Sequence, residues 1–203
     1  MRNLLLAASR RTPPPVEVPY LQYEGVESLI TGTALATAIG LSAGTAVNST
    51  AGFLKFVRGG KTLYLAKMCL RRSVSWNNLD ALGAVVGTRR VTIGGNEYMV
   101  KLPTGSLNEA GASAGGDWNE LMYAVCSARP VNYEGPVLAD FTPAELFVGD
   151  GSNARSSLCR ETQSTNSTNC IRRGRDNLTY YAGLPKSDAG TLVYWRPLLE
   201  LVE

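Results

Sequence analysis

The sequence contains no histidine. This absence excludes Ser-His-Asp and Cys-His nucleophilic catalysis and every metal site built on imidazole. The four cysteines form no Cys-x-x-Cys pair, so neither a zinc knuckle nor a thioredoxin-like motif is supported, and we expect no metal and no cofactor. We expect the cysteines to be buried as small apolar side chains. A disulfide between Cys159 and Cys170, which lie close together in a polar segment, stays an alternative.

Long hydrophobic runs are also absent. No stretch approaches the roughly 20 apolar residues that span a bilayer, so we expect no membrane insertion. The apolar run at residues 4–8 is too short for a signal peptide, and Arg10-Arg11 follow it at once. The net charge is only +3, and short Arg doublets indicate solvated surface rather than direct contact with nucleic acid.

With 203 residues, of which 44% are hydrophobic, the chain can form one globular domain with an appendage. We expect an extended N-terminal arm at residues 1–25, a short helical connector at 26–52 and a globular α+β domain at 53–203. The stretch PPPVEVPY favours polyproline-like backbone, and apolar residues before it predict that the arm lies against a partner chain or else is disordered. The expected arm residues are Leu4, Leu5, Leu6, Pro13, Pro14, Pro15, Val18 and Tyr20.

Two hairpins are predicted in the globular part. In FLKFVRGGKTLYLAK, apolar residues alternate on both sides of Gly59-Gly60, and VTIGGNEYMVKL repeats this pattern around Gly94-Gly95. Short helical pieces, broken at Gly32 and Gly40, are expected within VESLITGTALATAIGL.

Three further helix starts are indicated by capping residues. Ser75 precedes a stripe that includes Trp76, and Thr142 precedes PAELFV with Glu145 completing a capping box. In GGDWNELMYAV, Asp117 is the expected N-cap, with Glu120 three residues on. The apolar stripe of this helix starts at Trp118.

Residues 149–170 are rich in Gly, Ser, Asn and Thr and are expected to form a long irregular loop. After it, CIRRG, LTYYAG and VYWRPLLELV predict short strands that return to the sheet. Arg172, Arg173 and Arg196 are expected to pair with Glu161 or Glu200, and Arg196, before Pro197, to anchor the final strand.

Several segments together resemble a domain common in phage tail, fibre and other virion proteins. They are TGTALATAIGLSAGTAVNSTAGFLKFVRGGKTLYLAK, SVSWNNLDALGAVVG, VTIGGNEYMVKL, GGDWNELMYAV, SSLCRET, CIRRG and YWRPLLEL, and they span roughly residues 26–202. The closing WRP also resembles the end of modules with a C-type-lectin-like or formylglycine-generating-enzyme-like fold. The resemblance implies a small antiparallel sheet of hairpins with two or three short helices and long irregular loops. Residues expected to have structural roles are Trp76, Asp117, Trp118, Glu161, Arg172, Trp195 and Arg196.

The resemblance implies a structural protein of the virion, assembled in the cytoplasm of a bacterial host. As a tail, baseplate or fibre-attachment component, it would contact other virion proteins and copies of itself through the arm. A capsid decoration protein is an alternative.

A second alternative is a module that binds a host-surface glycan through loops 105–117 and 149–170. The residues considered are Trp118, Asp150, Asn153, Arg155 and Tyr180, although the position of Trp118 on an amphipathic helix favours a core role. In the virion proteins that this chain resembles, an aromatic and polar stretch stands where this chain has SSLC, and this difference weakens the glycan-binding alternative.

A catalytic role would need paired carboxylates, as in a glycan-cleaving lysin. Capping already explains three of the candidates, so we expect no enzymatic activity. The candidates are Asp117, Glu120, Asp140, Glu145 and Glu161.

Overall fold

The protein is described by a computed structural model over residues 19–106, 115–151 and 153–203. Within these residues it consists mostly of two six-stranded sheets with a few short helices. The expected antiparallel strands and short helices are therefore present, but the described part of the chain is mostly β and has two sheets rather than one small one. None of the helices in these ranges is long and apolar enough to span a membrane.

The first sheet, sheet A, is antiparallel throughout and has the order β1-β3-β4-β12-β7-β6. Both predicted hairpins lie in it, and the glycine pairs 59–60 and 94–95 have the positive φ values that tight two-residue turns require. Its strands are β1 (Leu21–Glu27), β3 (Phe53–Arg58), β4 (Lys61–Ala66), β12 (Leu198–Leu201), β7 (Asn96–Lys101) and β6 (Val86–Ile93).

The second sheet, sheet B, has the order β10-β9-β8-β11-β5-β2, and only its β8–β11 pair is parallel among the pairings described. Its strands are β10 (Tyr181–Pro185), β9 (Asn166–Arg173), β8 (Ser156–Gln163), β11 (Val193–Trp195), β5 (Arg71–Arg72) and β2 (Thr45–Ala46). The prediction of an irregular loop over 149–170 was wrong, because most of that range forms β8 and the start of β9.

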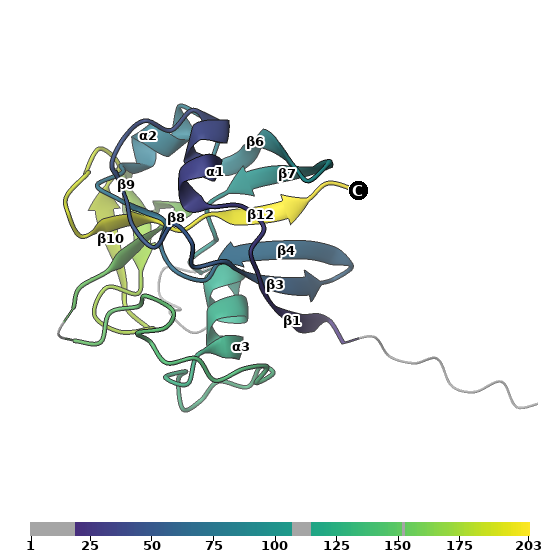
Figure 1. The fold of residues 1–203 in the computed structure, drawn as a ribbon. Coiled ribbons are helices and arrows are strands. Elements are labelled where there is room, and N and C mark those ends of the chain that lie inside the picture. The colour runs from purple at the N-terminus through teal and green to yellow at the C-terminus, as the bar shows by residue number, and fades with distance from the viewer. Residues whose placement is uncertain (1–18, 107–114, 152) are drawn as a thin grey trace, which may run out of the picture.

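Helices cover both faces of sheet A (Figure 1). Helices α1 (Gly32–Ile39) and α2 (Trp76–Asp80) contribute to one core cluster. The π-helix η1 (Trp118–Met122) continues into α3 (Tyr123–Val125), and both belong to the other cluster. Successive residues of β3, such as Phe53 and Leu54, fall into different clusters, because successive side chains of a strand point to opposite faces of the sheet.

The helix ends agree with some of the capping predictions and differ from others. Ser75 caps α2, as predicted, and it also forms a capping box with Asn78. Gly32 does not break a helix; it is the first residue of α1, after the N-cap Thr31, whereas Gly40 ends α1 in the left-handed conformation. The Thr142–Glu145 box is present, but residues 143–147 form turns instead of a helix.

The start of the domain also differs from expectation. Residues 21–25, expected in the arm, belong to β1, which pairs with β3 across a bulge between Tyr23 and Gly25. The remaining arm residues from Leu4 to Val18 lie outside the described residues. Residues 26–52, expected as a helical connector, contain the end of β1, α1 and β2, and Leu35 and Ile39 of α1 are buried in the core.

The four cysteines are buried and unpaired, as expected from their composition and spacing, so Cys159 and Cys170 form no disulfide. Burial raises the pKa of Cys170 to about 12. Burial also raises the pKa of Cys126 and Cys159, so these three thiols stay protonated near neutral pH. All four cysteines pack as small, buried side chains.

Arg196 lies between β11 of sheet B and β12 of sheet A and is fully buried. It donates hydrogen bonds to the carbonyls of residues 66, 67, 146 and 147 and to the hydroxyl of Ser157. It thus anchors the final strand as predicted, but through neutral oxygens. The expected pairing of Arg172, Arg173 or Arg196 with Glu161 or Glu200 was wrong, because Glu200 pairs with two lysines and Glu161 accepts from a backbone N–H group.

Candidate functional site

The four residues expected in a ligand-binding loop lie where segment 149–155 meets segment 174–180. The backbone N–H of Asn153 donates to Asp150 at 3.0 Å, and that of Arg155 donates to the Arg175 carbonyl at 2.9 Å. The Arg155 guanidinium lies 4.3 Å from the ring centroid of Phe147. Tyr180 packs against the side chains of Arg172 and Arg175, so each of the four residues has contacts within the protein.

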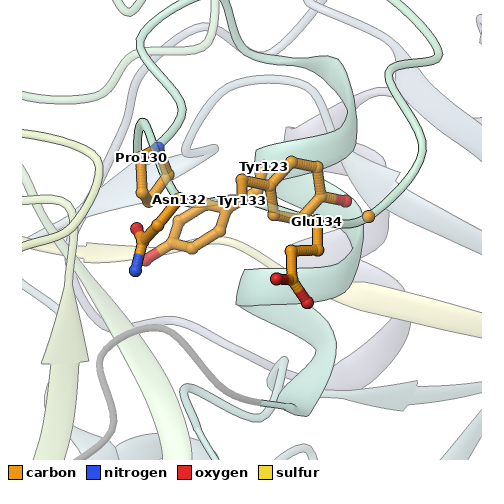
Figure 2. A pocket seen from close by; sticks show the side chains of 6 residues that line it. Tyr123, Pro130, Asn132, Tyr133 and Glu134 are labelled. Carbon is orange, nitrogen blue, oxygen red and sulfur yellow. The ribbon is translucent and has the colours of Figure 1, made fainter.

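A hollow surface lies elsewhere, around the end of α3. One hollow of about 400 Å³ is lined by Tyr123, Pro130, Asn132, Tyr133, Glu134 and Gly135 (Figure 2). A second of about 200 Å³ is lined by Tyr20, Leu21, Gly115, Asn119, Glu120, Tyr133, Gly135 and Pro136. Because the two share Tyr133 and Gly135, we treat them as one surface, the tyrosine groove.

Tyr133, at the centre of the tyrosine groove, rests on a buried support. Its ring meets the ring of Tyr123 edge to face, with centroids 5.7 Å apart and an interplanar angle of 87°. The Tyr123 hydroxyl accepts a hydrogen bond from Arg173 of β9 at 2.8 Å. Sheet B therefore holds Tyr123, and Tyr123 supports Tyr133.

Both phenols are neutral near pH 7. Burial raises the pKa of Tyr123, although the neighbouring Arg173 opposes this shift. Burial also raises the pKa of Tyr133. The tyrosine groove therefore presents neutral aromatic rings rather than phenolate charge.

The loop that carries Tyr133, residues 127–141, is tied to α3 at both ends. Arg129 donates to the carbonyls of Tyr123 and Ala139 and pairs with Asp140 at 2.5 Å. The N–H of Ser127 donates to the Phe141 carbonyl. These bonds fix the loop, so the tyrosine groove is formed without a bound partner.

Gly135 is required by the position of Tyr133. A Cβ atom at residue 135 would lie 2.3 Å from the Tyr133 hydroxyl oxygen and 2.4 Å from its ring carbon Cζ. Any larger residue at this position would therefore displace the ring.

Several exposed apolar side chains line the tyrosine groove or are next in sequence to residues that line it. Val131 is fully exposed, and Val137 and Tyr20 are 57% and 67% exposed. The backbone carbonyl of Tyr20 accepts from the N–H of Gly59, so the β3–β4 turn fixes the place where the chain enters the domain. Exposed large apolar side chains beside a hollow are typical of contact surfaces.

Beyond Glu120 the surface continues into a charged hollow of about 500 Å³. Its cations are Arg58, Lys61, Lys101 and Arg160, and Tyr20 and Glu120 line it together with the tyrosine groove. We call it the basic hollow.

Asp117 lies in the basic hollow and is not a helix cap. Its backbone is already helical and its side chain makes no capping bond. Instead it pairs with Arg58 at 2.6 Å and accepts from the N–H of Thr104. Glu120, predicted as the other half of the capping box, pairs with the same Arg58 at 2.9 Å.

All five candidate catalytic carboxylates make contacts that stabilise the fold. Asp117 and Glu120 share Arg58, and Asp140 pairs with Arg129. Glu145 caps the turn at Thr142, and Glu161 accepts from the N–H of Gly105. Burial raises the pKa of Glu161. Within the described ranges, no group of three or more Asp, Glu, Cys or His side chains could hold a metal ion.

The expected structural residues are mostly in the core. Trp118 and Trp195 are fully buried, and the Trp118 indole donates to the Leu178 carbonyl at 2.9 Å. Trp76 packs against the core at the start of α2. Arg172 is half-buried beside the ring of Tyr180.

Of the residues that line the tyrosine groove, only Tyr20 and Glu120 are candidates predicted from the sequence. A signal was present in the segment RPVNYEGPV, where a tyrosine and a glutamate lie between two prolines beside a glycine. Such turn residues around an aromatic side chain are typical of a fixed surface loop.

Comparison of the chain with protein-family models, curated proteins and solved structures gives no match.

Proposed function

We propose that this chain is a structural protein of a bacteriophage particle, a tail, baseplate or fibre-attachment component that assembles through its N-terminal arm. The observation that carries the proposal is the exposed apolar surface where the chain enters the domain. Tyr20 is exposed and lines the tyrosine groove, and the exposed Val131 and Val137 are next in sequence to the lining residues Pro130 and Pro136. A surface of this composition supports protein contacts.

The contacts of the carboxylates support a structural rather than a catalytic role. A glycoside hydrolase needs one carboxyl group to donate a proton and another to act as base or nucleophile. Here Asp117 and Glu120 neutralise Arg58, and the other candidates hold loops or turns. Their positions are explained by the fold itself.

The test is the oligomeric state of the full chain beside a variant that lacks residues 1–18, measured by size-exclusion chromatography with light scattering. The truncation must stop before Tyr20, because removal of residues 1–25 would delete most of β1 from sheet A. We expect the full chain to assemble and the truncated chain to be a folded monomer. If the truncated chain assembles equally well, the arm is not the assembly device.

A glycan-binding module is the second candidate, and the tyrosine groove supports it better than the predicted loops do. Tyr133, Asn132 and Glu134 place an aromatic ring beside amide and carboxylate groups, the combination that binds sugars by stacking and hydrogen bonding. A C-type-lectin-like fold belongs to this candidate, supported by the closing WRP motif. Glycan-array binding that is lost in Tyr133→Ala would favour it over assembly.

A capsid decoration protein is a variant of the structural proposal. It would also use the arm and the exposed apolar surface, but on a capsid lattice. Binding of the purified chain to capsids and not to tails would identify it.

A further inference from the structure

We propose that the tyrosine groove binds the proline-rich segment, residues 10–18, of a second copy of this chain. This inference rests on the proposed function, because it names the surface that receives the arm. The segment has the sequence RRTPPPVEV.

The chemistry of the tyrosine groove fits a polyproline ligand. Proline-rich segments bind grooves lined by aromatic rings, because the polyproline helix is extended before binding and loses little entropy. The tyrosine groove presents the half-buried ring of Tyr133 and the exposed ring of Tyr20. Pro130 and Pro136 complete its walls. Asn132 offers an amide to the ligand's free carbonyls, which polyproline backbone leaves without internal partners.

The charges of the surface and of the segment are complementary in order as well as in sign. The exposed Glu134 lies in the tyrosine groove, and the basic hollow adjoins its other part. In this hollow the exposed Arg160 is the cation for the segment's carboxylate, because the two lysines of the hollow already pair with Glu200. The segment begins with two arginines and carries Glu17 near its end. The arginines would therefore lie at Glu134 and Glu17 at the basic hollow, which fixes the direction of the bound segment.

The geometry of the chain entry favours exchange between copies. Tyr20 itself lines the tyrosine groove and leads directly into β1. Because Tyr20 already occupies part of its own groove, the residues just before it would have to turn sharply to lie in that same groove. Pro19 disfavours compact backbone at the residue before it, and β-branched Val16 and Val18 favour extended backbone. A polyproline helix of nine residues is about 28 Å long, so in extended form the segment can lie along the surface of a neighbouring copy.

The experiment compares charge variants of the full chain by light scattering and sedimentation. Glu134→Lys and the double variant Arg10→Glu/Arg11→Glu should each weaken association about tenfold. Combining them should restore association, because the charges are exchanged. Asp80→Lys is the matched control, since it makes the same change at an exposed carboxylate of α2, which packs in the other core cluster.

A ring-deletion series and a cross-link test the contact itself. Tyr133→Ala should weaken association, whereas Tyr133→Phe keeps the ring and should not. Copies carrying Thr12→Cys, mixed with copies carrying Asn132→Cys, should form a disulfide-linked dimer under mild oxidation. Thr12→Cys mixed with Thr92→Cys, in β6, should not. Circular dichroism melting curves verify that each variant is folded.

The outcomes separate this inference from the proposed function. If residues 1–18 are required but Glu134→Lys and Tyr133→Ala associate normally, the arm binds elsewhere; the inference fails and the proposed function stands. If the chain associates equally well without residues 1–18, both fail. A full chain that stays monomeric at its highest soluble concentration would also overturn the inference.

Discussion

Arg196 offers the sharpest test of how the two sheets are held together. Its guanidinium donates to the carbonyl oxygens of residue 66, the last of β4 in sheet A, and of residue 67, at 2.9 and 2.6 Å. It also reaches the Leu146 carbonyl at 2.5 Å and the hydroxyl of Ser157 in β8 of sheet B at 3.3 Å. One side chain thus joins both sheets and a surface turn.

Replacing Arg196 by Met keeps much of the volume but removes every donor. A hydrogen bond to a charged group contributes about 1.5–3 kcal/mol, and a buried acceptor left without a partner costs a similar amount. The three shortest bonds, at the lower limit, imply a loss of about 4–5 kcal/mol in the free energy of unfolding. Since a domain has only about 5–15 kcal/mol in total, this variant should be close to unfolding.

Arg196→Lys keeps the charge and loses the planar fork of donors. One ammonium cannot reach acceptors on several sides, so we expect a loss of about 3 kcal/mol. Arg90→Met is the control, because Arg90 is exposed and pairs only at the surface with Glu97, and its loss should stay below about 1 kcal/mol.

The assay is urea unfolding followed by tryptophan fluorescence, since Trp118 and Trp195 are fully buried and report on the core. A loss below about 1 kcal/mol for Arg196→Met would refute the reasoning, because the carbonyls would then have other partners or water. A stability of Arg196→Lys equal to that of the native chain would show that charge alone, not the fork, is what matters.

Three other changes test separate parts of the structure. Hydrogen bonds from Lys101 and Lys61 lower the pKa of Glu200, even though burial opposes this shift. The stabilisation by Glu200 is thus complete above its unfolded pKa of about 4.3 and is lost as the pH falls through the lower folded pKa. Glu200→Gln should cost about 1–3 kcal/mol in urea unfolding at pH 7, and a cost that persists at pH 2 would contradict this. Gly135→Ala should displace Tyr133 and weaken arm-dependent association while the core stays folded, as light scattering and circular dichroism would show; unchanged association would mean that the ring position is unimportant. The buried Cys170 thiol, with its pKa raised to about 12, should react with a thiol reagent only after unfolding, and rapid reaction in native buffer would disprove its burial.

Local patterns predicted the hairpins of sheet A because each signal lies within a few residues. Gly59-Gly60 and Gly94-Gly95 set the turns, and alternating apolar residues set the strands. The hairpin of β8 and β9 was missed because its residues are polar. Ser157 is fully buried in spite of its hydroxyl, since that oxygen accepts from Arg196. A sequence pattern cannot show such a partner 39 residues away.

The residues of the candidate site also have partners that are distant in the sequence and that a local pattern does not show. Asp117 and Glu120 have the spacing of a capping box, but Arg58 lies 59 and 62 residues before them and takes both carboxylates. The ion pairs with Arg58, which form only in the folded protein, replace the capping bonds that the local sequence pattern predicts. The tyrosine groove likewise needs Tyr20, Tyr123 and Tyr133 from three segments, and only the fold brings them together.

The place of β12 has a consequence for how the protein is made. This strand, formed by residues 198–201, lies in the middle of sheet A and joins the β3–β4 hairpin to the β6–β7 hairpin. While the ribosome still encloses those residues, the two hairpins have no shared neighbour to bond to. A nascent chain can therefore close sheet A only once residue 201 has left the exit tunnel, and a chain cut short before β12 would expose unpaired strand edges to quality-control proteases.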